Sequence, residues 1–321
     1  MDSGGGRVVM KKIFILFLLI VMITVSLTAI DIFNTGWCFN LVDGNFFYPN
    51  YIADPFSSRF SADWRTLSIN EVVLDSDVRR DITAGTRFSL FSFRKIDNPN
   101  IGVQLDFWVT VPMFMEGSSN DFLGMDGIYS IGLVLSPATW ITARLSRHHI
   151  CTHAGDEIDT EGDGDPSIDY DPTANLNSSA YVRDDFGASL ALKPLNLFKI
   201  TWMEDMMLIY GDYYFFWPGK DPLAFRQIKP NRDAFSWYNV GLELKTPKFR
   251  GARVYSALNI SYWEELAWMP CYSLDLGLEV KGPLKGLLLR VALNYYDGRS
   301  LMNNFYNRRE RFSGISVSIE R

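Results

Sequence analysis

Residues 103–111 read VQLDFWVTV, with an apolar side chain at every odd-numbered position and Gln104 and Asp106 among the even ones. Successive side chains of a β-strand point to opposite faces, so this stretch has one apolar and one largely polar face. Residues 272–280, YSLDLGLEV, repeat the pattern near the other end of the chain. Strands of this kind form the wall between lipid and a polar lumen in membrane β-barrels.

Twelve segments of this general character lie between residues 65 and 319, and their connectors alternate between short and long. The segments are 65–73, 83–95, 103–111, 126–136, 139–151, 180–192, 200–216, 238–244, 254–262, 272–280, 287–296 and 313–319. Short connectors carry proline, as at residues 97–99, and proline suits turns that need no backbone donor. The pattern predicts an all-β fold, an antiparallel transmembrane β-barrel of about 12 strands with its long loops at one rim. A soluble antiparallel sandwich is the alternative.

Aromatic residues make up 15% of the chain and gather where strands meet long connectors. Examples are residues 213–217, YYFFW, and the pairs at 262–263 and 295–296. Tyrosine and tryptophan favour the membrane–water interface because one part of each side chain is apolar and another is polar. We therefore predict a girdle of aromatic side chains at the rim that carries the long loops.

The first 29 residues predict a cleaved secretory signal peptide. Lys11-Lys12 precede an unbroken apolar run at residues 13–23, which is too short to cross a bilayer comfortably as a helix. Small residues follow as far as Ala29, near which cleavage is expected. The polar stretch before Met10 suggests that Met10 is the true start.

Export without a helical span predicts a place in the cell outer membrane. We divide the remaining chain into residues 30–64, an N-terminal periplasmic or plug-like segment, and residues 65–321, the barrel. Such a protein is expected to meet outer-membrane lipid, lipopolysaccharide and the barrel assembly machinery. Many outer-membrane barrels end in an aromatic residue that helps this machinery recognise them, whereas this chain ends Ile319-Glu320-Arg321.

Charge and cysteine content narrow the possibilities further. The net charge is −6 and the pI is about 5.2, which argues against nucleic acid because phosphates require a basic face. The three cysteines, Cys38, Cys151 and Cys271, are an odd number for an oxidising compartment. Cys151 and Cys271 both fall at predicted loop ends, where they could form a disulfide, so at least one thiol is left over.

All three histidines of the protein lie within six residues, in HHICTH at residues 148–153. On an extended strand His149, Cys151 and His153 project to one face. Apolar residues such as Leu145 share that face. The sequence therefore predicts that this face meets lipid, unless a bulge intervenes near the rim.

Three interpretations of this cluster stay open. In the first, His149 and His153 bond carboxylates and loop backbone and so order the long loop. In the second, the imidazoles, the Cys151 thiolate and a carboxylate bind zinc, although the spacing matches no closed zinc motif. In the third, Cys151 is the nucleophile of a hydrolase and either histidine is its base. Glu157 or Asp156 would then orient the base.

The loop that follows is acidic and has the start of a calcium-binding pattern. Its carboxylates are those of Asp159, Glu161, Asp163 and Asp165. Their spacing resembles the first half of a calcium loop, but Tyr170 stands where the bidentate glutamate belongs. The alternative is a solvated acidic surface loop. A divalent cation, calcium or zinc, is thus the cofactor class that the sequence suggests.

Three motifs carry a family resemblance: YIADP with RFS at residues 51–61, HICTHAGDE at 149–157 and YYDGRS at 295–300. With them the chain resembles the DUF1207 family of bacterial predicted outer-membrane barrels over most of its mature length. The family's middle pattern is close to His-x-Ser-Ser-His-x-Gly-Asp-Glu, so Cys151 and Thr152 replace two serines here. The resemblance implies the fold and the location, and it leaves the activity open because the family has no assigned function.

A shorter likeness concerns the lipid A deacylases of the outer membrane. These enzymes use a His-x-Ser pair and a loop-side glutamate on the outer face of a small barrel. The matching positions here are His149 and Cys151, with Glu157 or Glu161 as the carboxylate. The likeness implies a lipid acyl hydrolase in which cysteine replaces serine.

Two functions remain. The first is a non-enzymatic envelope barrel that binds or passes a small solute, its lumen filled by inward groups such as Arg87, Asp106 and Arg144. The second is a lipid A or lipid acyl hydrolase with a site at the barrel rim formed by His149 and Cys151. A pore predicts conductance that is indifferent to Cys151, whereas the hydrolase predicts loss of activity in Cys151→Ala.

Overall fold

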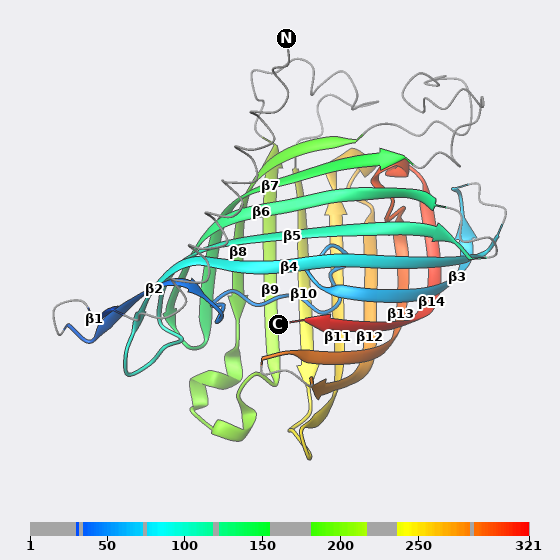
Figure 1. Ribbon diagram of the computed structural model, residues 1–321. Coiled ribbons are helices and arrows are strands. Elements are labelled where there is room, and N and C mark those ends of the chain that lie inside the picture. Colours follow the sequence, from blue (N-terminus) through cyan, green and yellow to red (C-terminus); the bar gives the residue numbers. More distant parts are fainter. Residues whose placement is uncertain are drawn as a thin grey trace, which may run out of the picture.

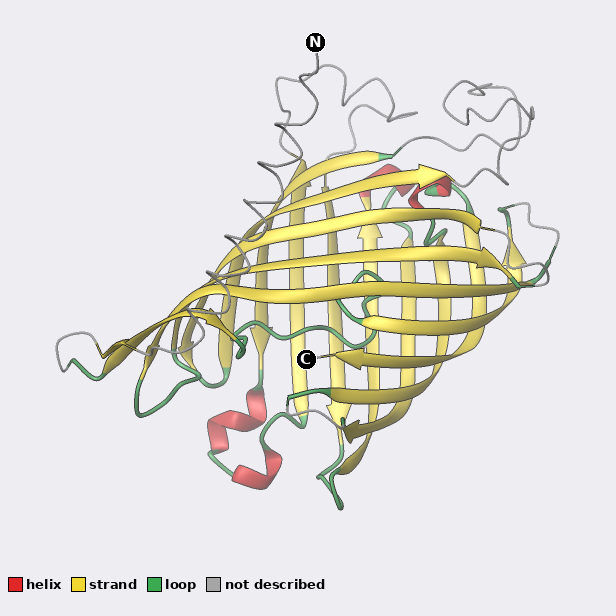
Figure 2. Cartoon of the chain, viewed as in Figure 1, coloured by secondary structure: helices red, strands yellow, loops and turns green. Residues whose placement is uncertain are grey.

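The computed structural model describes residues 30–31, 35–72, 76–117, 122–154, 181–216, 236–282 and 286–320. Its strands are β1 (Ile30–Asp31), β2 (Trp37–Asp43), β3 (Phe60–Asn70), β4 (Val78–Lys95), β5 (Gly102–Glu116), β6 (Phe122–Ala138), β7 (Ile141–Ala154), β8 (Val182–Leu192), β9 (Met207–Phe216), β10 (Ser236–Lys245), β11 (Ala252–Trp263), β12 (Pro270–Lys281), β13 (Leu288–Arg299) and β14 (Arg309–Glu320). Four single-turn 3-10 helices are η2 (Pro194–Phe198), η3 (Thr201–Met203), η4 (Glu264–Leu266) and η5 (Asn303–Phe305). They lie at the two ends of a wall made of strands (Figure 2). Within these ranges no helix is long and apolar enough to cross a membrane.

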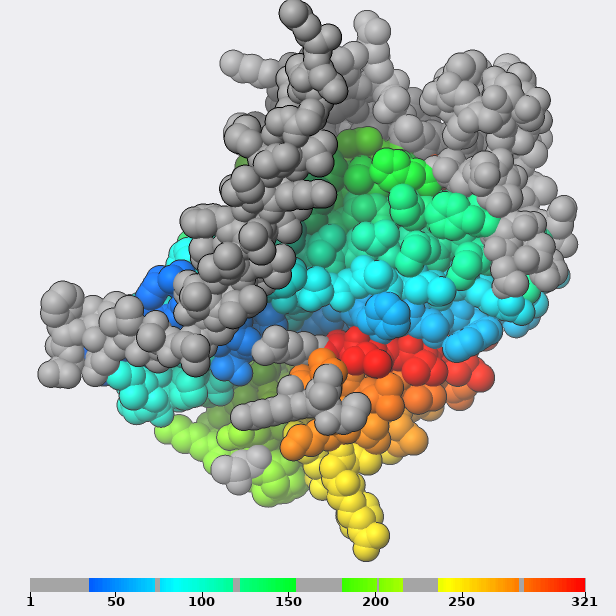
Figure 3. Space-filling model, viewed as in Figure 1, coloured from blue at the N-terminus to red at the C-terminus, as the bar shows by residue number. Residues whose placement is uncertain are grey.

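The strands from β3 to β14 form one closed ring. Each pairs antiparallel with its neighbours in the sequence, and β14 pairs with β3, with Ile319 opposite Phe60. Of the 14 strands, β1 and β2 lie outside this ring, which leaves 12 in it. Figure 3 shows the red β14 directly beside the blue β3. The predicted antiparallel barrel of about 12 strands is therefore confirmed (Figure 1).

The alternating pattern explains why these segments form a wall. On β5, the side chains of Gln104 and Asp106 point into the lumen and are 0% and 1% exposed, while the intervening apolar residues are partly exposed on the outside. Each barrel strand has at least 10 residues, enough to cross a bilayer core as a tilted strand. The outward face is apolar, and the lumen holds the polar side chains.

Most connections are longer at one end of the barrel than at the other, as predicted; the exceptions are the β8–β9 connection and the β5–β6 connection, which was predicted to be long at residues 113–125 but spans only residues 117–121. Residue 320 and the tight turns lie at one end, called here the short-turn end, and the other end is called the long-loop end. The β8–β9 connection was predicted as a tight turn at residues 193–194. It instead continues to Met206, because η2 and η3 occupy residues that the pattern assigned to a strand beginning at 200.

The wall begins at Phe60, before the boundary expected at residue 65. Residues 60–64 belong to β3 and continue the alternation, since Ser61 and Asp63 face the lumen and are buried there while Phe60 and Trp64 are exposed on the outside. The long strand β4 pairs with two strands on the same side. Its residues 78–83 pair with β3, and its residues 89–95 pair with β2.

Residues 44–59, called here the plug segment, run from β2 to β3 inside the barrel. Tyr48 and Tyr51 donate hydrogen bonds to Asp212 of β9 at 2.9 and 3.1 Å, and all three side chains are buried. The Ile52 N–H donates to Glu243 of β10 at 2.7 Å. These contacts attach the segment to the wall across the lumen.

Paired charges fill much of the remaining lumen. Arg144 contacts Asp106 at 2.8 Å, and Arg290 contacts Glu279 at 2.7 Å. All four side chains are at most 5% exposed. Charges buried this deeply persist only when they are paired and hydrogen-bonded. The inward polar residues thus fill the barrel, as the sequence predicted for this class of groups.

Residues 300–308 close over the long-loop end of the lumen and are called here the cap loop. Met302 and Phe305 are 2% and 4% exposed. The side-chain amide of Asn303 donates to Asp126 of β6 at 2.8 Å, and the Tyr306 ring lies 5.2 Å from that of Tyr181. The loop therefore reaches from β13 and β14 across to the far side of the barrel.

Candidate active site

Strand β7 divides the histidine cluster between its two faces. His149, Cys151 and His153 lie on the outward face with Leu145, which is 65% exposed, whereas His148 is 3% exposed on the inside. The pairing of β7 with β8 runs from Ile141 to Cys151 without a register shift. No bulge intervenes in that pairing, so the outward direction follows from simple alternation.

His148 belongs to the packing of the lumen. Its ring lies between those of Trp108, Tyr214 and Trp237, with centroids 5.6, 5.3 and 5.8 Å away. Its Nδ1 is 3.8 Å from Asp185, which also pairs with an arginine of the same strand. This histidine is therefore separated by the barrel wall from the other two.

His149 is held from both sides by the neighbouring strands. Its Nδ1 lies 3.1 Å from a carboxylate oxygen of Asp184, directly opposite on β8. Its ring stacks on Tyr129 of β6, with centroids 4.6 Å apart and an interplanar angle of 26°. Because a carboxylate only accepts, Nδ1 carries the proton of this bond, which leaves Nε2 as a proton acceptor. Arg147 contacts the same Asp184 oxygen at 3.4 Å.

Cys151 lies two residues further along the same face, about 7 Å from His149 along the strand. Its Sγ donates to the carbonyl oxygen of Gly127 at 3.5 Å, on the facing position of β6. A Cβ added at Gly127 would lie 2.9 Å from this sulfur, so only glycine leaves the thiol its present position. The thiol is half-buried rather than enclosed.

The possible Cys151–Cys271 disulfide is excluded by the barrel geometry. Cys151 faces outward on β7, whereas Cys271 faces inward on β12 and is 2% exposed. The Cys271 sulfur instead accepts a hydrogen bond from the Arg299 N–H at 3.3 Å. Both cysteines are free, as is Cys38. Cys151 is therefore available as a thiol.

Outward tyrosines lie near the long-loop end on several strands. Tyr213, Tyr238 and Tyr262 lie opposite one another on β9, β10 and β11. Tyr129 is outward and 43% exposed on β6. Their aromatic neighbours in sequence, such as Trp263, instead point inward and are buried. The predicted girdle thus uses only alternate members of each aromatic run. His149 stacks on Tyr129, one of these outward tyrosines, and both residues lie in the half of their strand nearer the long-loop end.

The remaining candidate residues are not brought together in the part of the chain that the structure describes. His153 is exposed and lies opposite Met125. Glu157 and the four proposed metal ligands lie outside the described residues; the ligands are Asp159, Glu161, Asp163 and Asp165. Among described residues, no three His, Cys, Asp or Glu side chains are grouped closely enough to hold a metal ion.

Comparisons with known proteins identify the fold. No family model and no curated protein matches the chain. The structure is similar to an active-site mutant of outer membrane phospholipase A from Escherichia coli, with a TM-score of 0.50 and 12% identity over 86% of this chain and 93% of that one. It is equally similar to the calcium-bound phospholipase dimer from Salmonella typhi, with a TM-score of 0.50 and 11% identity over 83% and 94%. The fold is that of an outer-membrane β-barrel. At these identities the likeness establishes the fold alone.

In an outer-membrane β-barrel the outward face meets lipid, and the aromatic girdle lies at the headgroup level. The pair formed by His149 and Asp184 is therefore expected at the lipid interface. The sequence did not indicate Asp184, because β7 and β8 are separated by a long connector and only their register brings the two residues together. The available signal was the outward position of Asp184 on a strand whose other outward residues are apolar.

Proposed function

We propose that this outer-membrane β-barrel hydrolyses acyl ester bonds of membrane lipids, with Cys151 as nucleophile, His149 as base and Asp184 as the residue that orients the base. The single observation that carries the proposal is the 3.1 Å contact between His149 Nδ1 and Asp184, on the same outward face as a free thiol. Nucleophile, base and orienting carboxylate are the three parts of a nucleophilic hydrolase site.

The proposed chemistry needs one side-chain rotation and four proton transfers, two as the thioester forms and two as it is hydrolysed. Rotation of the Cys151 side chain breaks its hydrogen bond to Gly127 and turns Sγ toward Nε2 of His149. Nε2 takes the thiol proton, and the thiolate attacks the ester carbonyl carbon to form a tetrahedral intermediate. Its collapse leaves a thioester, and the leaving alcohol receives the proton from Nε2. Water, activated by the same nitrogen, then hydrolyses the thioester and restores the thiol.

The surroundings support a lipid as the substrate class. On the outward face of β7, Leu145 lies two residues from Arg147, on the side of the middle of the strand. This face therefore offers both a cation and an apolar contact. An ester bond of a phospholipid or of lipid A lies between a polar headgroup and its acyl chains, at the level where the tyrosine girdle is expected. Two solved structures with this fold are phospholipases by name, which is consistent with the proposal but does not carry it.

Passage of a solute, the other function considered, receives less support from the described conformation. The plug segment bonds to Asp212 and Glu243 across the lumen, and the cap loop reaches Asp126 at the long-loop end. Buried ion pairs such as Arg144–Asp106 occupy space between them. We therefore propose that solutes are not passed in this conformation.

Location and partners follow from the same reasoning. We propose that the protein resides in the cell outer membrane with its short-turn end toward the periplasm, as bacterial outer-membrane barrels are oriented. Lipopolysaccharide and the barrel assembly machinery are the proposed partners. Membership of the DUF1207 family also remains a proposal, based on the motif at residues 149–157.

A lipid hydrolysis assay tests the proposed function. The mature protein is refolded in detergent micelles with phospholipid or lipid A, and fatty acid release is measured. We expect Cys151→Ala and His149→Ala each to lower the rate by at least about 100-fold, since a positioned base contributes about 100- to 10,000-fold. Asp184→Asn should lower it as well, because an amide can hold the wrong imidazole tautomer.

Cys38→Ala is the matched control. Cys38 is also a free, half-buried thiol, but it lies on β2, away from the histidine. Its removal should leave the rate unchanged. Equal activity of wild type and Cys151→Ala, or no turnover of either lipid by folded wild type, would exclude the proposed role of Cys151.

A further inference from the structure

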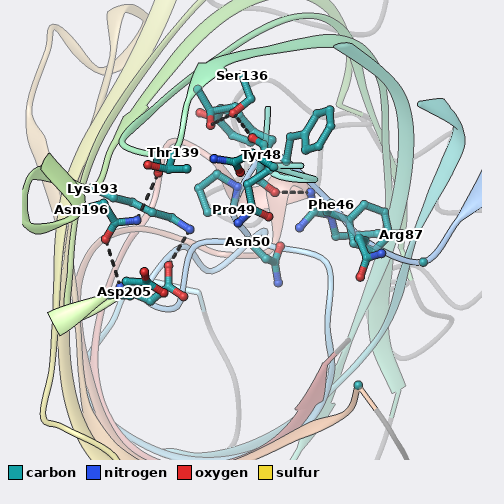
Figure 4. Close-up of a pocket in the computed structure, with 18 of the residues that line it drawn as sticks. Phe46, Tyr48, Pro49, Asn50, Arg87, Ser136, Thr139, Lys193, Asn196 and Asp205 are labelled. Carbon is teal, nitrogen blue, oxygen red and sulfur yellow. Dashed lines mark hydrogen bonds and ion pairs between the residues drawn. The ribbon is translucent and has the colours of Figure 1, made fainter. Parts of the chain in front are cut away.

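A large cavity opens at the short-turn end of the barrel, on the opposite side of the plug segment from the cap loop. Its volume is about 1080 Å³, at the upper end of the range for small-molecule sites. The plug segment forms its floor, and β-turns and the β8–β9 connection form its walls. Figure 4 shows Tyr48, Pro49 and Asn50 on one side and Lys193, Asn196 and Asp205 on another.

The charged groups that line this cavity balance one another. Three are cationic and three are anionic: Arg87, Lys193, Lys199, Glu204, Asp205 and Glu320. Lys193 pairs with Asp205 at 2.7 Å, and Glu320 pairs with Arg290 of β13 at 2.6 Å. The Arg87 guanidinium donates to the Tyr48 carbonyl at 2.8 Å and lies over the Phe46 ring. Four of the six charges thus have partners, and the other two, Lys199 and Glu204, are of opposite sign. The cavity therefore offers no strong field of one sign to an ion.

Neutral hydrogen-bonding groups make up most of the remaining lining. They are Asn45, Asn50, Asn98, Asn100, Asn196, Ser136, Thr139 and Thr142. Amide and hydroxyl side chains both donate and accept hydrogen bonds. They therefore match a ligand with neighbouring hydroxyl groups, each of which also donates and accepts. The half-buried Phe46 ring adds an apolar surface within this polar lining. This combination suits a ligand that is rich in hydroxyls and carries no net charge.

The floor of the cavity is fixed rather than loose. The Phe47 N–H donates to Gln104 at 3.1 Å, and the Asn50 amide donates to Glu320 at 2.9 Å and to the Ser58 carbonyl at 2.8 Å. A site of this kind is preorganised, so binding need not order the segment that forms it.

We infer that this cavity is a binding site for a neutral saccharide that enters from the short-turn end. The inference does not depend on the proposed hydrolase, since the cavity and Cys151 lie on opposite sides of the barrel wall and toward opposite ends. The amides of Asn98 and Asn100 hold hydroxyl groups of the ligand, and the plug segment prevents its passage through the lumen.

Calorimetric titration of the refolded protein tests the inference, with maltotriose as the neutral probe and citrate and trilysine as charged probes. We expect saturable binding of maltotriose and no binding of either charged probe. Asn98→Leu with Asn100→Leu should weaken maltotriose binding about four- to 100-fold, since each of the two lost hydrogen bonds is worth about two- to tenfold. Asn307→Leu, an exposed asparagine at the long-loop end, is the matched control and should bind like wild type.

Heat-dependent mobility on gels first verifies that each variant is folded. Binding of citrate or trilysine as tight as that of maltotriose would overturn the inference, because it would show that the cavity recognises charge. Maltotriose binding that is unchanged by the double substitution would overturn it by showing that maltotriose binds elsewhere on the protein. No binding of maltotriose by folded wild type would also overturn it.

Discussion

Asp54 of the plug segment should make barrel stability fall as the pH rises. Burial, with a smaller contribution from the nearby Asp212, raises the pKa of this carboxyl from 3.8 to about 6, although the hydrogen bond from the Phe56 N–H and the charge of Arg59 lower it. The folded state therefore binds this proton more tightly than the unfolded state. The stabilisation is fully present below pH 3.8 and is lost as the pH rises through about 6.

The magnitude follows from the shift. A rise of about 2 pKa units corresponds to about 3 kcal/mol at neutral pH, and this is an upper bound because Asp54 lines small internal cavities. In Asp54→Asn the amide oxygen can still accept from the Phe56 N–H, which Asp54 now does at 3.0 Å. With a urea slope of about 1–3 kcal/mol per molar, the variant should gain about 1–3 M in unfolding midpoint at pH 8. At pH 3.5 it should gain nothing.

The assay is urea unfolding of the refolded barrel, followed by tryptophan fluorescence between pH 3.5 and 8. Asp205→Asn is the control of opposite sign. Burial alone would raise the pKa of Asp205, but the Lys193 ammonium outweighs it and lowers the pKa. The Asp205 contribution is therefore present above the unfolded pKa and lost on acidification, so this variant should lose stability at pH 8 only. Parallel pH profiles of wild type and Asp54→Asn would refute the reasoning about the plug segment.

Three further outcomes follow from the structure. Arg144→Met should lower stability by about 3–5 kcal/mol in urea unfolding because it leaves the buried Asp106 with only Arg87, 3.9 Å away, as an ionic partner, and Arg144→Met with Asp106→Leu should recover most of the loss; a single variant as stable as wild type would contradict this. Gly127→Ala should slow iodoacetamide labelling of Cys151 several-fold, since the new Cβ lies within 2.9 Å of the sulfur; unchanged labelling would contradict it. Wild type should give no steady conductance in planar bilayers, and regular ion channels would show that residues 44–59 do not block the lumen.

Most of the wall could be predicted from the sequence because one physical pattern controls it. Apolar and polar side chains alternate wherever a strand separates lipid from the lumen, as in residues 103–111, and the alternation also gives the outward direction of His149. The limits of the strands were predicted less well. Residues 60–64 alternate in the same way, with Phe60 and Trp64 outward and Ser61 and Asp63 inward, yet they were left out of the wall. Residues 200–206 were assigned to a strand although η3 begins at Thr201.

The site itself depends on contacts that the sequence does not contain. Asp184 lies opposite His149 only because β7 and β8 pair in one register across a long connector. Cys151 and Cys271 seemed able to pair because both lie near loop ends, but side-chain alternation sends one outward and the other inward. Residues 30–64 were predicted to be a periplasmic or plug-like segment, and the sequence does not indicate the hydrogen bonds from Tyr48 and Tyr51 to Asp212 that hold residues 44–59 inside the lumen.

The most direct test of the proposed enzyme is to look for the acyl group on Cys151. Refolded wild type is mixed with phospholipid, quenched in acid within the first turnovers, and digested for mass spectrometry. We predict a fatty acyl thioester on the peptide that contains Cys151, removed by hydroxylamine, with no adduct and no fatty acid release in Cys151→Ala. Fatty acid release that continues at the wild-type rate in Cys151→Ala would contradict the central role given to this thiol.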